Sequence, residues 1–180
     1  MKKLALVFAL AFVSATSFAQ KSVMVGGAAM YPTKNIIENA VNSKDHTTLV
    51  AAVKAAGLVE TLSSAGPFTV FAPTNEAFNK LPAGTVETLV KPENKGTLTS
   101  ILTYHVVAGK LTAADIIAKI KAGRGKATMK TVQGETLTAS LKGKHVILTD
   151  EKGGKAKVTI ANVNQSNGVI HVIDTVLMPK

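Results

Sequence analysis

The sequence has 180 residues, no cysteine and no tryptophan, and a formal net charge of +10 from 21 basic and 11 acidic side chains. Without cysteine there can be no disulfide bond, no thiolate metal site and no cysteine nucleophile, so packing must stabilise the fold. The length suits one domain with a sizeable core.

The first 19 residues have the pattern of an export signal. Lys2 and Lys3 precede an apolar stretch at residues 4–13, and a small-x-small cleavage site follows. We predict a signal peptide at residues 1–19 and a mature chain from Gln20, located in the periplasm, at the cell surface or outside the cell. The apolar stretch is much shorter than the roughly 20 residues that a transmembrane helix needs. An uncleaved amphipathic anchor is the alternative, and no transmembrane segment is predicted.

The first half of the mature chain is predicted to be mainly helical. Residues 20–34 form an extended or loose lead-in, because Gly26 and Gly27 lie among small apolar residues and Pro32 follows. Thr74 or Asn75 can cap a helix that follows a short strand. The predicted helices lie at residues 35–41, 43–57, 74–81, 85–90, 93–103 and 112–123.

The second half changes to a period of two, which is typical of strands separated by glycine-containing turns. The predicted strands lie at residues 68–72, 104–107, 128–132, 135–141, 144–149, 155–161 and 169–176. Because helices come first and most strands come later, the fold class is α+β and not a doubly wound parallel sheet.

Basic residues are concentrated in the second half of the chain. Eleven basic and four acidic side chains lie between Lys110 and Lys157. Such a segment attracts anionic surfaces in a salt-dependent way. Nucleic acid is not the expected partner, because Arg124 is the only arginine and few aromatic residues are available for base stacking. Anionic polysaccharide or the cell envelope is favoured over nucleic acid, and a merely solvated basic face is favoured over both.

No motif in the sequence indicates catalysis. His171 and Asp174 are three residues apart, so on a strand their side chains point to opposite faces. No Gly-x-Ser-x-Gly segment supplies a nucleophile, and the histidines lack the spacing of metal ligands. We therefore predict a non-enzymatic protein with no catalytic residue, no metal and no cofactor, in which His171 is satisfied by a backbone or side-chain partner.

Three segments occur in an informative order: GPFTVFAPTNEAF at residues 66–78, LTYHVVAG at residues 102–109, and NGVIHVIDTVLMP at residues 167–179. Together they resemble the signature blocks of the fasciclin (FAS1) family. The resemblance extends over nearly the whole mature chain, and we assign residues 35–180 as one FAS1 domain. It implies a wedge-shaped β-sandwich with several short helices packed on one edge, and an extracellular adhesion or interaction module.

The resemblance implies two candidate binding positions. In animal relatives an integrin-binding Asp-Ile motif lies just before the last block, and here Asn162 and Val163 stand at that place. The carboxylate that an integrin metal would bind is therefore missing. Tyr104 and His105 match a block that has been tied to adhesion in relatives. On a strand these two side chains point to opposite faces, so we expect one in the core and the other hydrogen-bonded at a strand edge.

The leading functional hypothesis is a secreted or periplasmic adhesion module that binds a cell-surface or matrix protein or an anionic polysaccharide. The alternative is a carrier of an apolar small molecule such as a carotenoid or a lipid, with the apolar lead-in covering a groove. The expected state is a monomer. Family partners are so varied that the fold alone does not select one.

Overall fold

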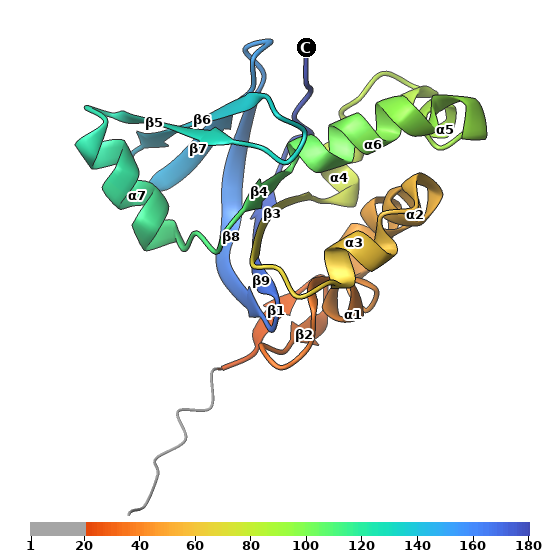
Figure 1. The fold of residues 1–180 in the computed structure, drawn as a ribbon, viewed down its shortest axis with the longest axis horizontal. Coiled ribbons are helices and arrows are strands. Elements are labelled where there is room, and N and C mark those ends of the chain that lie inside the picture. The colour runs from red at the N-terminus through yellow and green to blue at the C-terminus, as the bar shows by residue number, and fades with distance from the viewer. Residues whose placement is uncertain (1–20) are drawn as a thin grey trace, which may run out of the picture.

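The structure, a computed structural model, describes residues 21–180. It combines one curved sheet with helices on two sides (Figure 1). The predicted signal peptide at residues 1–19 lies outside the described residues. The α+β prediction is confirmed.

A hairpin begins the described part of the chain. Strands β1 (Val23–Val25) and β2 (Ala28–Met30) pair antiparallel, and Val25 and Met30 are buried. Gly26 in the turn has φ = 58°, and a Cβ atom there would overlap the Ser43 side chain. Glycine thus allows the turn to lie directly against the segment that follows α1 (Ile36–Ala40).

Six α-helices are grouped on the right of Figure 1, and one lies on the left. The right-hand group is α1, α2 (Thr47–Ala56), α3 (Val59–Ser63), α4 (Asn75–Asn79), α5 (Thr85–Leu89) and α6 (Lys95–Tyr104). The left-hand helix is α7 (Ala113–Ala122). Two 3-10 turns, η1 (Lys44–His46) and η2 (Pro92–Asn94), precede α2 and α6.

The helix boundaries follow local capping chemistry. The Thr74 side chain accepts a hydrogen bond from the Ala77 N–H, and Thr112 and Asp115 form a reciprocal capping box. Gly57 ends α2 in the left-handed conformation at φ = 74°. The predicted cap at Thr74 is confirmed, and the observed ends at Gly57 and Thr112 agree with the predicted helices at residues 43–57 and 112–123.

Seven strands form the main sheet in the order β4-β3-β9-β8-β7-β6-β5. Their bounds are β3 (Phe68–Pro73), β4 (Val106–Ala108), β5 (Lys126–Lys130), β6 (Thr136–Lys142), β7 (His145–Thr149), β8 (Lys155–Gln165) and β9 (Gly168–Ile173). The sheet curls back on itself, so that β4 at one end approaches the chain just after β5 at the other end. There the Val132 N–H donates a hydrogen bond to the Val106 carbonyl at 2.7 Å. This curling produces the wedge.

Strands β3 and β9 form the parallel pair of the main sheet, next to the edge strand β4. They come from the first and last sequence blocks, which are about a hundred residues apart but lie side by side in space. Gly168 pairs with Phe68, and a Cβ atom at Gly168 would overlap the Phe68 backbone. The close approach of the two strands therefore requires a glycine at this position.

The predicted strand at residues 104–107 is wrong at its start. Tyr104 is the last residue of α6, His105 is its C-cap, and the strand begins at Val106. The apolar residues Leu98, Ile101 and Leu102 are buried along α6. Their helical spacing extends the helix through the Tyr-His pair, which overrides the β propensity of the segment.

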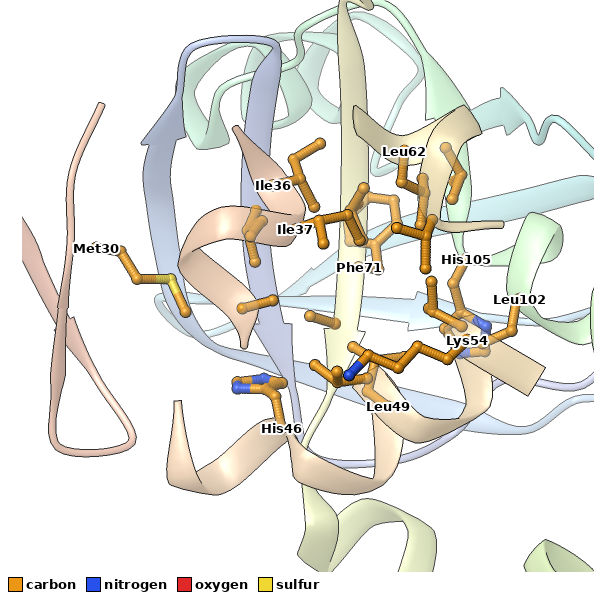
Figure 2. A pocket seen from close by; sticks show the side chains of 18 residues that line it. Met30, Ile36, Ile37, His46, Leu49, Lys54, Leu62, Phe71, Leu102 and His105 are labelled. Atoms are coloured by element: carbon orange, nitrogen blue, oxygen red, sulfur yellow. The ribbon is translucent and has the colours of Figure 1, made fainter. Parts of the chain in front are cut away.

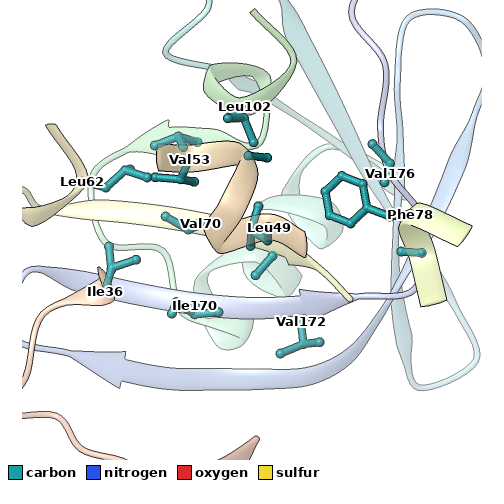
Figure 3. Packing of buried hydrophobic residues seen from close by; sticks show 14 of the residues in the cluster. Ile36, Leu49, Val53, Leu62, Val70, Phe78, Leu102, Ile170, Val172 and Val176 are labelled. Atoms are coloured by element: carbon teal, nitrogen blue, oxygen red, sulfur yellow. The ribbon is translucent and has the colours of Figure 1, made fainter. Parts of the chain in front are cut away.

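Two hydrophobic clusters lie on the two faces of strands β3 and β9. The first lies between the right-hand helices and the sheet, and it contains Leu49, Val53, Val70 and Ile170 (Figure 3). The second lies inside the curl of the sheet and is closed by α7. Alternation along β3 explains the division, because Val70 and Phe71 point to opposite clusters.

Candidate interaction surfaces

Tyr104 lies in the core and not on the surface. Its side chain is completely buried in the second cluster, and its hydroxyl donates a hydrogen bond to the Thr136 carbonyl at 2.9 Å. Burial raises the pKa of Tyr104 to about 12. The residue thus connects the end of α6 to the start of β6, and it presents no side-chain surface to a partner.

His105 is also buried, next to Tyr104. Its Nδ1 lies 2.8 Å from the Ile101 carbonyl, and its Nε2 lies 3.0 Å from the backbone nitrogen of Leu177. Since a carbonyl only accepts and an N–H only donates, Nδ1 carries the proton and Nε2 accepts. Burial lowers the pKa of His105 to about 4, so the ring is neutral at neutral pH. The expectation that one of the two side chains lies at a strand edge is therefore wrong.

Asn162 and Val163 lie in an irregular part of β8. Asn162 has φ = 59°, and its Oδ1 accepts a hydrogen bond from the Ala113 N–H, at the first residue of α7, at 2.7 Å. Val163 is completely buried. Asn162 is exposed but already engaged in positioning α7, and Val163 offers no contact surface.

His171 occupies a closed hydrogen-bond network near the same bulge. Its Nδ1 accepts from the Asn162 N–H at 3.3 Å, its Nε2 lies 2.8 Å from the Leu111 carbonyl, and the ring stacks on Phe71. Burial lowers the pKa of His171. These contacts confirm the prediction that neighbouring groups satisfy the His171 ring. Asp174 does not contact the ring through a hydrogen bond, since it accepts from the Lys157 N–H.

The exposed face of strands β5 to β8 carries the basic residues. The strand registers place Lys126, Ser140, Ile147 and Lys157 in one row across four strands. A second row contains Thr128, Thr138, Thr149 and Lys155. We call these two rows the basic sheet face. The alternate residues of the same strands point inward to the second cluster.

The two rows of the basic sheet face carry only basic and neutral side chains, and the nearby carboxylate of Asp174 accepts from the Lys157 N–H at the edge of the face. Neither row contains a carboxylate, and the only ion pair among residues 21–180 joins Lys180 to Glu151 at 3.0 Å. An open depression of about 420 Å³ lies along the face, and its lining includes three lysines, Lys142, Lys155 and Lys157, and one carboxylate, Asp174. Sequence reasoning found the basic segment but not this face, although the alternation of lysine and threonine with apolar residues was a usable signal.

Within residues 21–180 no group of three histidine or acidic side chains could hold a metal ion. The helices of this part of the chain are also too short or too polar to cross a membrane.

Comparisons with known proteins agree with this architecture. Residues 44–179 match the Fasciclin domain family. A solved FAS1 domain pair from the insect cell adhesion molecule Fasciclin I superposes with a TM-score of 0.70 at 19% identity, covering 81% of this chain and 51% of that chain. The fold is therefore of the FAS1 class.

Sequence relatives extend the comparison. Protein sll1483 of Synechocystis is 52% identical over 89% of this chain and 82% of its own length. Immunogenic protein MPB70 of Mycobacterium bovis is 41% identical over 78% of this chain and 66% of its own length. The porcine transforming growth factor-beta-induced protein ig-h3 is 41% identical over 73% of this chain, which corresponds to 17% of that protein. The chain belongs to the fasciclin family, whose domains serve adhesion and interaction and not catalysis.

Proposed function

We propose that this protein is an exported adhesion module that binds anionic polysaccharide at the cell surface through the basic sheet face. The observation that carries the proposal is the arrangement of Lys126, Lys155 and Lys157 on one exposed sheet face without a neutralising carboxylate in the two rows. Membership of a family of adhesion domains supports the general class.

The geometry of the face fits an extended polymer better than a compact ligand. Strands are spaced by about 4.8 Å, so Lys126 and Lys157 at the two ends of one row are roughly 14 Å apart. Ser140 lies between them, and Thr138 and Thr149 lie in the neighbouring row. Their hydroxyl groups both donate and accept hydrogen bonds, as sugar hydroxyls do. A chain of anionic sugars can therefore contact charge at both ends and hydroxyls in the middle.

The carrier hypothesis has less support. The apolar cavity beneath α2 has a volume of about 40 Å³. Pockets for drug-sized ligands have volumes of about 300–1,000 Å³. A carotenoid or an intact lipid would require a large displacement of the helices.

The test is sedimentation of the purified protein with envelope polysaccharide from its own host across a salt series. Polygalacturonate serves as a defined anionic probe, and dextran serves as its neutral control. The Debye length falls from about 10 Å at 0.1 M salt to about 3 Å at 1 M. We expect binding to the anionic polymers that fades as salt rises, and no binding to dextran.

A matched pair of double variants locates the binding surface. Lys126→Gln with Lys157→Gln removes the charges at the ends of one row, whereas Lys91→Gln with Lys95→Gln removes the same charge from the helical side. We expect the first pair to weaken polygalacturonate binding about tenfold, given about 0.2–1 kcal/mol for each exposed charge contact. Equal weakening by both pairs would show that only net charge matters, and the assignment to the basic sheet face would fail.

A further inference from the structure

A small apolar cavity lies between α2 and the sheet, on the side of the molecule opposite to α7 (Figures 1 and 2). Its volume is about 40 Å³, and its walls are mainly aliphatic, including Leu49, Val53, Leu62 and Val70. None of the residues of the basic sheet face lines it. The cavity is therefore a separate feature of the molecule.

His46 brings a polar atom into this apolar cavity. The side chain is 1% exposed and lines the cavity wall (Figure 2). Its Nδ1 is hydrogen-bonded to the Ser43 hydroxyl at 2.9 Å, whereas its Nε2 makes no hydrogen bond of normal geometry. Burial lowers the pKa of His46, and the Ala72 backbone carbonyl, which belongs to the same cavity wall, raises it by a smaller amount. Among residues 21–180 this is the only buried side-chain nitrogen or oxygen atom without a partner. An unpaired buried polar atom typically costs about 1–3 kcal/mol.

Water is a poor partner for Nε2 in this place. A buried water normally makes two to four hydrogen bonds. The other histidine that lines the cavity is His105, whose two nitrogens are already bonded to Ile101 and Leu177. Lys54 is the one remaining charged residue in the lining, and it is exposed. The cavity thus suits an apolar group that carries a single hydrogen-bonding function.

We propose that this cavity is a binding site for an apolar ligand group with one hydroxyl, in which the hydroxyl bonds to Nε2 of His46. A hydroxyl both donates and accepts, so it pairs with either tautomer of the ring. A carboxylate fits less well, because its charge would be desolvated beside Nε2 and the one cation of the lining, Lys54, is exposed to solvent. The proposal is independent of polysaccharide binding.

The volume defines the size of the bound group. At about 10–15 Å³ for each water-sized group, the cavity holds about three or four such groups. Ile37, Val50 and Val59 are only partly buried in its wall, beside the exposed Lys54. The ligand is therefore either a free short alcohol or the hydroxylated end of a longer apolar chain that leaves through this side.

Titration with n-alcohols of increasing length tests the proposal. The protein purified after export, labelled with ¹⁵N, reports the imidazole nitrogen shifts of His46 and the state of the fold in one sample. We expect the Nε2 resonance to shift on binding and the affinity to rise about fourfold for each methylene that enters the cavity. A rise that stops at propanol or butanol identifies a free short alcohol, and a rise that continues to octanol identifies the end of a longer chain. Absence of any Nε2 shift up to the solubility limits would overturn the proposal.

The decisive variant is His46→Asn. Asparagine can retain the hydrogen bond to Ser43 in place of Nδ1, but it has no counterpart of Nε2. For each protein we measure the dissociation constants of n-butanol and n-pentane and take their ratio. The two ligands differ in solubility in water, but this difference is the same for both proteins and cancels when the two ratios are compared. We expect the preference for the alcohol to fall about fivefold in His46→Asn, as the loss of one hydrogen bond predicts.

The matched control is His145→Asn, which changes an exposed histidine at β7. It should leave the ratio unchanged. If His46→Asn loses its folded amide spectrum, His46→Phe replaces it, since a phenyl ring keeps most of the volume and also lacks Nε2. An unchanged alcohol preference in a folded His46 variant would refute the site.

Discussion

Nε2 of His105 accepts a hydrogen bond from the Leu177 N–H at 3.0 Å, although the two residues are 72 positions apart. The same ring bonds the Ile101 carbonyl through Nδ1 at 2.8 Å. One buried imidazole therefore joins the last turn of α6 to the C-terminal segment. The histidine of the central sequence block thus has a structural explanation that requires no partner.

Replacement of His105 by alanine should reduce stability without changing the binding surface. His105→Ala leaves the Leu177 N–H and the Ile101 carbonyl without their side-chain partner, so we expect a loss of about 1–3 kcal/mol in the free energy of unfolding. Urea denaturation measures it, with the exposed His145→Ala as control. Polygalacturonate binding should persist wherever the variant is folded. Normal stability combined with lost binding would show that His105 belongs to a binding site.

Stability should fall in mild acid because three buried histidines are held neutral. Burial lowers the pKa of His105 to about 4 and also lowers the pKa values of His46 and His171. The unfolded chain takes up these protons near pH 6.5, whereas the folded chain does not, so stability is present at neutral pH and decreases as pH falls from about 6.5 to about 4. His105 alone accounts for about 3 kcal/mol of this change. Urea denaturation across this interval should give a smaller slope of stability against pH for His105→Asn than for the unaltered protein, with His46 and His171 accounting for the slope that remains.

Asn162 should matter for its backbone conformation and for its bond to α7. Asn162→Ala loses the acceptor for the Ala113 N–H and places an alanine at φ = 59°, so we expect a loss of about 2 kcal/mol. Asn162→Gly loses only the hydrogen bond and should cost about 1 kcal/mol. Asn162→Asp keeps an acceptor and should cost least. Equal stability of the alanine and glycine variants would show that the left-handed conformation has no influence.

Gly168 should not tolerate a side chain, because it lies where β9 approaches β3 most closely. Gly168→Ala forces a methyl group onto the Phe68 backbone, and either β3 or β9 must shift. We expect a loss of about 3 kcal/mol or more, in the range of severe core overpacking. Gly96→Ala is the control, because Gly96 lies in α6 with open space around it. It should raise stability by about 0.5–1 kcal/mol. Thermal unfolding of both variants separates the two effects.

The sequence predicted the helix ends well wherever a neighbouring side chain or a single backbone angle sets them. Thr74, Thr112 and Gly57 mark helix ends through their own hydrogen bonds or backbone angles, and the predicted helices at residues 43–57, 74–81 and 112–123 begin or end at these residues. The Tyr104-His105 pair was placed on a strand because the following residues have β propensity. Its actual position depends on the burial of α6 against the core, which no short window contains.

The candidate site was less predictable than the fold. The excess of lysine between Lys110 and Lys157 was visible in the sequence, but the rows across the strands depend on register. Asn162 and Val163 match the place of a family motif, but in the structure the Asn162 side chain in β8 bonds to the start of α7 and Val163 lies in the core. The unpaired Nε2 of His46 had no sequence signal, because it depends on which atoms are absent around a buried ring.

The sequence by itself determined the α+β class, the family and the basic character of the second half, because periodicity, capping residues and charge are properties of neighbouring residues. Only the tertiary structure decided that Tyr104 and His105 are buried, that Lys126 and Lys157 share a row, and that His46 faces an apolar cavity. These features arise from long-range pairing and packing. Their energies depend on the neighbours that folding brings together and not on the order of residues along the chain.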